Sequence, residues 1–159
     1  MRRALLIVAG AALAAPSAQA QPVGRWISGF GQGMHEAVVR DVRWQEVRFS
    51  CPTPQQTRFP PAVTLTVQGR GAESEGRLVL FDVGGRSIPV EMRRQPAAEP
   101  GRVEYRLEAT DDASRARMVE LVRALSGGGR LVIGTPDDGG RHGFSLRGSA
   151  EALAGCPRA

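Results

Sequence analysis

The strongest constraint on the fold of this chain is a two-residue alternation of apolar and polar side chains that recurs in several short segments. In residues 102–108, Val103, Tyr105 and Leu107 alternate with charged residues. Successive side chains of a strand point to opposite faces of a sheet, so this alternation predicts strands that bury one face. The same pattern predicts further strands at residues 45–51, 63–68, 87–93, 131–135 and 142–147.

The polar positions of residues 102–108 are Arg102, Glu104, Arg106 and Glu108. Opposite charges that alternate along a strand suit a solvated outer face on which neighbouring strands form ion pairs. They also suit a polar binding surface. Both interpretations remain open from the sequence alone.

Residues 78–83 depart from the alternation because they are almost continuously apolar. Such a run predicts a strand that is covered on both faces. Gly84 and Gly85 follow it and predict a tight hairpin turn into residues 87–93. Pro89 has no N–H to donate, so we expect the second strand of this hairpin at an edge of the sheet or at a bulge.

One segment has helical instead of two-residue periodicity. Asp111 or Asp112 is expected to cap its beginning, and Gly127 to Gly129 its end. Its buried stripe has the spacing of a helix and consists of Met118, Leu121, Val122 and Leu125. Ser149 is expected to cap a short final helix. The predicted fold class is therefore α+β: a mainly antiparallel sheet curled into a β-sandwich or partial barrel, with one mid-chain helix and a short C-terminal helix.

The first twenty residues have the three parts of an export signal. Arg2 and Arg3 precede an apolar run at residues 4–15, and Ala18-Gln19-Ala20 has the small residues of a cleavage site. The run is short for a membrane anchor. We therefore expect residues 1–20 to be removed as a signal peptide. Residues 21–159 then form a single exported β-rich domain, periplasmic or secreted, with no transmembrane segment.

Both cysteines of the chain, Cys51 and Cys156, lie in the predicted mature part. In an oxidising compartment an even pair is expected to form a disulfide, which would tie the C-terminus to an early strand. Two free thiols or a metal-binding pair are the alternatives.

The charge of the mature chain excludes one class of partner. After removal of Arg2 and Arg3, 19 arginines face 16 acidic residues, and the chain has no lysine. An excess of about three positive charges is too small to indicate a nucleic-acid partner.

Neither histidine is placed for catalysis. His142 shares a strand face with Phe144, while Ser145 points away, so a Ser-His pair within this strand is geometrically poor. His35 has no further ligands at a metal-binding spacing. The glycines of residues 29–33 predict a turn, since no strand–helix unit surrounds them. We predict no catalytic residues, no metal site and no cofactor.

Large aromatic side chains mark interfaces as well as cores. Trp26, Phe30 and Trp44 lie where the alternation is weakest, and they are expected either to pack in the core or to face a partner. Asp137 and Asp138 lie in the loop that joins the last two strands. They are a further partner-facing possibility, with calcium binding and plain turn formation as alternatives.

The last third of the chain resembles a known family. An amphipathic helix and a glycine stop are followed by Arg130-Leu131-Val132-Ile133, then by residues 143–149 (GFSLRGS), Ala152-Leu153 and a terminal Cys156. This order resembles the C-terminal part of small exported proteobacterial proteins of the invasion-associated locus B family. The resemblance implies a periplasmic or secreted β-rich domain with an envelope or host-interaction role and no known active site.

These observations lead to three functional hypotheses. The first is an exported, non-enzymatic domain that binds a protein or another envelope component. The second is a small periplasmic hydrolase in which folding brings carboxylates to His35 or His142. The third is an inhibitor or accessory protein of an envelope or host enzyme, with residues 136–140 as its protruding loop.

Overall fold

The structure is a computed structural model and describes residues 23–56, 58–127, 129–136 and 139–157. The predicted signal peptide, residues 1–20, lies outside these ranges. Asp137 and Asp138 also lie outside them.

The described residues form nine strands and two α-helices, joined by turns and loops. The strands are β1 (Ile27–Gly31), β2 (Met34–Arg40), β3 (Glu46–Pro52), β4 (Ala62–Gln68), β5 (Ser74–Val83), β6 (Arg86–Pro96), β7 (Arg102–Glu108), β8 (Arg130–Gly134) and β9 (Arg141–Ser145). The helices are α1 (Asp112–Leu125) and α2 (Ser149–Ala152), and a 3-10 turn, η1 (Leu153–Gly155), follows α2. None of the helices in the described ranges is long and apolar enough to cross a membrane.

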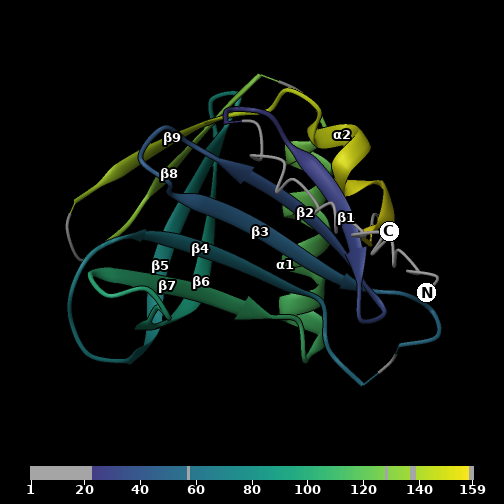
Figure 1. Cartoon of the computed structure of the whole chain (residues 1–159), viewed down its shortest axis with the longest axis horizontal. Coiled ribbons are helices and arrows are strands. Elements are labelled where there is room, and N and C mark those ends of the chain that lie inside the picture. The colour runs from purple at the N-terminus through teal and green to yellow at the C-terminus, as the bar shows by residue number, and fades with distance from the viewer. Residues whose placement is uncertain (1–22, 57, 128, 137–138, 158–159) are drawn as a thin grey trace, which may run out of the picture.

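All nine strands belong to one sheet in the order β1-β2-β3-β4-β7-β6-β5-β8-β9, and every neighbouring pair is antiparallel. This confirms the α+β, mainly antiparallel class. The sheet is not closed, because β1 and β9 are its two edges. It bends over so that β5 and β6 cross behind β3 and β4, and α1 packs on the concave side (Figure 1).

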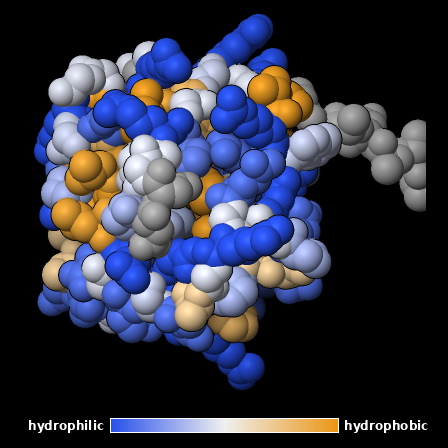
Figure 2. All heavy atoms as spheres, turned by 90° about the vertical axis from the view of Figure 1, so that its left-hand side faces the viewer, coloured by the Kyte–Doolittle hydropathy of each residue, from blue (hydrophilic) through white to orange (hydrophobic). Residues whose placement is uncertain are grey.

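The predicted cover on both faces of residues 78–83 is wrong. Val79, Phe81 and Val83 of β5 are buried, but Leu78 and Leu80 are 53% and 40% exposed. The alternation of a strand thus operates even within this apolar run, since the helices lie on one face of the sheet only. On the side of the molecule that carries the β8–β9 hairpin, the surface is mostly hydrophilic with separate hydrophobic patches (Figure 2).

Pro89 lies in an inner strand, which corrects the predicted edge position. Gly84 and Gly85 form the two-residue turn of the β5–β6 hairpin, with φ of 57° and 87°. In this geometry Arg86 and every second residue after it direct their backbone groups toward β5, so Pro89 faces away from β5. On that side β7 pairs with β6 only from Arg93 to Pro96. The missing N–H of Pro89 therefore breaks no ladder hydrogen bond.

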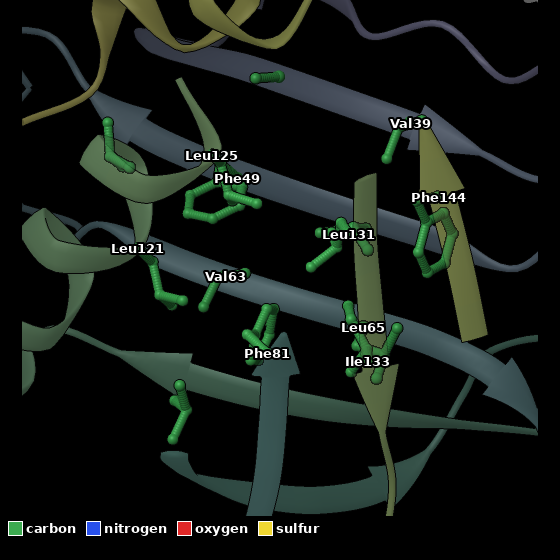
Figure 3. Close-up of a cluster of buried hydrophobic side chains, with 14 of the residues drawn as sticks. Val39, Phe49, Val63, Leu65, Phe81, Leu121, Leu125, Leu131, Ile133 and Phe144 are labelled. Atoms are coloured by element: carbon green, nitrogen blue, oxygen red, sulfur yellow. The ribbon is translucent and has the colours of Figure 1, made fainter. Parts of the chain in front are cut away.

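The core lies between the two halves of the folded sheet. Strands β2, β3 and β4 supply one wall, while β5, β8 and β9 cross them steeply and supply the other (Figure 3). Helix α1 closes the side with the predicted stripe, which is fully buried. The labelled side chains of this core are Val39, Phe49, Val63, Leu65, Phe81, Leu121, Leu125, Leu131, Ile133 and Phe144.

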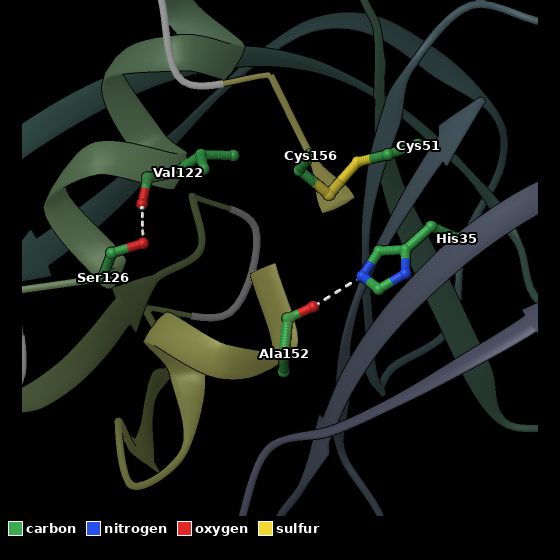
Figure 4. Close-up of a disulfide and its surroundings, with 6 residues drawn as sticks. All are labelled: His35, Cys51, Val122, Ser126, Ala152 and Cys156. Atoms are coloured by element: carbon green, nitrogen blue, oxygen red, sulfur yellow. Dashed lines mark hydrogen bonds between the residues drawn. A yellow bond between two sulfur atoms is a disulfide. The ribbon is translucent and has the colours of Figure 1, made fainter. Parts of the chain in front are cut away.

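The disulfide between Cys51 and Cys156 is present and confirms that prediction, with Cα atoms 5.2 Å apart. It joins the end of β3 to the residue after η1 (Figure 4). Beside it, His35 Nε2 donates a hydrogen bond of 2.7 Å to the carbonyl of Ala152. The C-terminal segment is thus held on the sheet at two points.

Ser149 does not cap the final helix as predicted. Gly148 is the N-cap residue of α2, and its φ of 83° suits glycine. The Ser149 hydroxyl lies instead within hydrogen-bond distance of the carbonyls of Leu125 (2.6 Å) and Leu146 (2.8 Å). It therefore links the end of α1 to the segment after β9.

Asp111 is the N-cap residue of α1, which decides between the two predicted candidates, Asp111 and Asp112. The backbone N–H of Ser114 donates to Asp111 Oδ1 at 2.8 Å, and the Ser114 hydroxyl accepts from the backbone of Asp111, which makes a capping box. Hydrogen bonds from the Ser114 backbone and then from its hydroxyl lower the pKa of Asp111. The carboxylate form is therefore favoured in the folded state.

We expect Asp111→Ala to lower Tm at neutral pH and to lose this effect in acid. A carboxyl whose folded pKa lies below its unfolded value of about 3.9 stabilises the fold above that value. The contribution disappears as the pH falls through the folded pKa. Thermal melts from about pH 7 to about pH 2.5 check this, with Asp111→Asn as a cap that does not titrate. An Asp111→Ala penalty that is independent of pH would contradict the prediction.

Candidate functional site

The three aromatic residues singled out in the sequence do not come together. Trp26 is only 2% exposed, so it is not a partner-facing residue. Its indole Nε1 donates to the carbonyl of Ser145 at 2.9 Å, and its ring packs on Phe49 with centroids 6.1 Å apart. The Trp26 side chain thus belongs to the core, where it connects the chain before β1 to the end of β9.

Phe30 and Trp44 are 70% and 54% exposed. They lie at opposite ends of β2, because the β1–β2 turn precedes Met34 and the β2–β3 turn follows Arg40. The structure therefore offers two separate aromatic surfaces.

The turn that carries Trp44 is built by Asp41. Its backbone N–H donates to the Gln45 carbonyl (3.0 Å), and its carboxylate accepts from the backbone N–H groups of Arg43 (2.9 Å) and Gln45 (2.8 Å). The Trp44 N–H donates to the Asp41 carbonyl at 3.1 Å. These bonds leave Trp44 with a φ of 60°, in the left-handed region.

A hairpin turn of this kind usually has glycine or asparagine at the left-handed position. A bulky side chain there is strained by about 1–3 kcal/mol. Such strain at an exposed aromatic residue is typical of a functional position, because folding alone favours another residue there. Asparagine does not occur in the chain, but glycine occurs 20 times.

Trp44 lies at the rim of a groove of about 380 Å³ on the outer face of the sheet. We call this the Trp44 groove. Its polar and charged lining residues come from β2, β3, β4, β7 and the loop before β7: Arg40, Glu46, Arg48, Thr66, Glu99, Arg102 and Glu104.

The strand register places four of these side chains in one row. Arg40 is opposite Glu46, Glu46 is opposite Thr66, and Thr66 is opposite Glu104. Gln95 of β6 continues the row, since it is opposite Glu104 and donates to its carboxylate at 3.1 Å. Alternating donors and acceptors thus run across five adjacent strands.

The arginines of the groove are paired with carboxylates. Glu46 accepts from Arg40 Nε (2.5 Å) and from Arg48 Nε (2.8 Å). Burial acts to lower the pKa of Arg48, but hydrogen bonds and charge from Glu46 and Glu36 outweigh it and raise the pKa above the usual value. The Arg48 guanidinium therefore stays charged and fixed in place.

Arg102 connects the groove to the strained turn. Its Nε is 2.9 Å from Glu99 Oε2, and its terminal nitrogen donates to the Trp44 carbonyl at 2.6 Å. Because this contact is to the backbone, it positions the turn whatever side chain residue 44 carries.

Both histidines make internal hydrogen bonds. His142 is buried, with Nδ1 3.0 Å from Gln45 Oε1 and Nε2 3.2 Å from the Thr135 hydroxyl. His35 bonds to the Ala152 carbonyl, as described above. Over the ranges that the structure describes, no group of three His, Cys, Asp or Glu side chains is arranged to hold a metal ion.

A larger cleft, of about 620 Å³, lies where β6 and β7 separate beside the first turn of α1. Leu78, Pro89 and Arg106 are among its lining residues. Arg106 is paired with Glu108 at 2.8 Å, and Pro89 makes the open side of β6 a poor template for an added strand. Nothing in this cleft matches the strained, exposed aromatic residue of the Trp44 groove.

Trp44 and the charged face of residues 102–108 are both evident in the sequence, but nothing in the sequence connects them. Arg102 lies 58 positions after Trp44, and only the β4–β7 pairing brings β7 near the turn. The alternation of charges was the one available signal for the groove. It indicates a polar face but not which strands adjoin it.

Together these features define a class of protein: a small β-rich domain in which one folded-over antiparallel sheet encloses a core and presents a charged outer face. The YfjT family model matches residues 24–153, and the chain belongs to the YfjT family. No curated protein and no solved structure matches the chain.

Proposed function

We propose that the chain is an exported, non-enzymatic domain that binds a protein or another envelope component through the Trp44 groove. The observation that carries this proposal is the exposed Trp44 side chain at a backbone position that favours glycine. Folding stability alone does not account for tryptophan at this backbone position. Binding gives a reason for it, because tryptophan supplies a large rigid contact surface.

Export is the second part of the proposal. The signal-like residues 1–20 and the resemblance to invasion-associated locus B proteins support a periplasmic or secreted location. The Cys51–Cys156 disulfide also suits an oxidising compartment.

The two alternatives receive less support. A hydrolase that uses His35 or His142 would have to release the histidine from its hydrogen bond to Ala152 or to Gln45. An inhibitor that presents residues 136–140 would act through a segment of which Asp137 and Asp138 lie outside the described residues.

We expect Trp44→Gly to abolish binding without weakening the fold. Glycine relieves the left-handed strain, and the turn keeps its hydrogen bonds because Asp41 and Arg102 contact backbone atoms of residues 43–45. The free energy of unfolding should equal or exceed that of the wild type, by up to about 2 kcal/mol, because the entropic cost of ordering glycine offsets part of the relieved strain. Denaturant unfolding and capture from envelope extract measure the two effects.

Phe30→Gly and Phe59→Gly are the matched controls, because both side chains are exposed aromatics away from the Trp44 turn. Each variant is expressed as the full chain with its own N-terminal segment and kept oxidised. The proposal predicts a saturable ligand that both controls retain and Trp44→Gly loses. Loss of the ligand with Phe30→Gly and its retention with Trp44→Gly would move the site to the other end of β2.

A further inference from the structure

The chemistry of the Trp44 groove restricts the ligand further, and this argument rests on the proposed function. Three arginines and three glutamates line the groove, and the contacts described above pair Arg40 and Arg48 with Glu46 and Arg102 with Glu99. The groove is therefore electrically balanced. An anionic ligand would have to break these pairs, and a cationic ligand would meet Glu104, whose carboxylate already accepts from Gln95. A neutral polar ligand disturbs neither arrangement.

The position of the groove disfavours an extended peptide as ligand. It lies over β3, β4 and β7, which have a hydrogen-bonded neighbour on each side at this point of the sheet. No open backbone edge is available there for strand addition, which is the usual way for a sheet to bind an extended peptide.

What the groove offers is a row of fixed, mostly planar polar groups beside an aromatic ring. The guanidinium of Arg40 donates, the carboxylates of Glu46 and Glu104 accept, and the Thr66 hydroxyl does both. A sugar ring needs this combination, because its hydroxyl groups both donate and accept around its rim. Its C–H face is apolar and stacks on an indole ring.

We infer that the Trp44 groove binds a neutral oligosaccharide. The volume of about 380 Å³ is at the lower end of the range of about 300–1,000 Å³ that is usual for small-molecule sites. One sugar ring stacks on Trp44, and the next lies along the row from Arg40 to Glu104.

Tryptophan fluorescence tests this inference directly. The chain has two tryptophans, and Trp26 is buried, so a change in emission on adding sugar reports on Trp44. The oxidised full chain is titrated with chitotetraose, maltohexaose and cellohexaose as neutral ligands, and with oligogalacturonate as an anionic one. We expect a saturable change with at least one neutral oligosaccharide. Because Trp44→Gly removes the reporter, binding to this variant is measured by titration calorimetry, and we expect none.

Glu104→Gln is expected to weaken the same binding about tenfold, the usual effect of losing one charge-assisted hydrogen bond. Glu75→Gln, on the exposed start of β5 and outside the groove, should bind as the wild type does. Equal loss of affinity in both variants would show that the sugar does not lie along the row from Arg40 to Glu104.

The remaining outcomes separate this inference from the proposed function. If no neutral oligosaccharide binds but an envelope protein is captured in a Trp44-dependent way, the carbohydrate inference is wrong and the binding domain stands. A stronger response to oligogalacturonate would overturn the argument from charge balance. If neither assay depends on Trp44, both proposals fail.

Discussion

Removal of the Cys51–Cys156 disulfide is expected to lower the free energy of unfolding by about 4–5 kcal/mol. The bond closes a loop with a sequence separation of 105, and the chain-entropy cost of closing a loop of that length in the unfolded state has this magnitude. For a domain of this size, the loss corresponds to a fall in Tm of about 10–20 °C. Both sulfurs belong to buried residues, so the bond also fixes the C-terminal segment against the core.

Denaturant unfolding of three samples measures this effect: the oxidised wild type, the reduced wild type and the Cys51→Ala/Cys156→Ala double variant. The last two should agree to within about 1 kcal/mol, because the short side chains leave similar packing. Hydrogen exchange in α2 and η1 should rise more than in β4, since the disulfide holds them on the sheet. A loss below about 1 kcal/mol on reduction would contradict the prediction.

Trp26→Ala is expected to cost about 3–5 kcal/mol, as is usual for an aromatic side chain removed from a core. The buried ring packs on Phe49, and its N–H bonds to the Ser145 carbonyl. A backbone bond from Trp26 N to the Arg147 carbonyl, 3.0 Å, lies beside it. The side chain therefore connects the two ends of a sheet that strand pairing leaves open.

Trp26→Phe separates the two contributions. It keeps an aromatic ring on Phe49 but removes the indole N–H, so we expect a smaller loss, of about 1–2 kcal/mol. Trp44→Gly is the natural contrast, since it removes the other tryptophan with no loss of stability. If Trp26→Ala unfolded at the same denaturant concentration as the wild type, the assignment of Trp26 to the core would be wrong.

The two tryptophans show where sequence interpretation reaches its limit. Both lie in the part of the chain where the alternation is weak, and the sequence left open whether each packs in the core or faces a partner. Strands β1 and β2 were not predicted at all, because the glycines of residues 29–33 interrupt any pattern. The two strands pair with each other, and β2 also pairs with β3.

Several predictions that depend on one segment alone were confirmed, although Ser149 does not cap the final helix. Strand β7 runs from Arg102 to Glu108, as the alternation indicated, and α1 buries its four-residue stripe behind Asp111. The disulfide could also be predicted from the sequence, because a chain with two cysteines allows one intramolecular pairing. Which face of a strand is buried is a local property, since it follows from the period of the side chains.

Properties that depend on several segments required the structure. The apolar run of β5 does not show that Leu78 and Leu80 remain uncovered, because cover is supplied by other elements. The Trp44 groove exists only because β4 pairs with β7, which places Glu104 opposite Thr66. By itself, the sequence determined strands β3 to β9, the main helix and the polar character of the outer face. The tertiary structure decided which charges adjoin Trp44, because strand order depends on long-range packing and not on the local pattern.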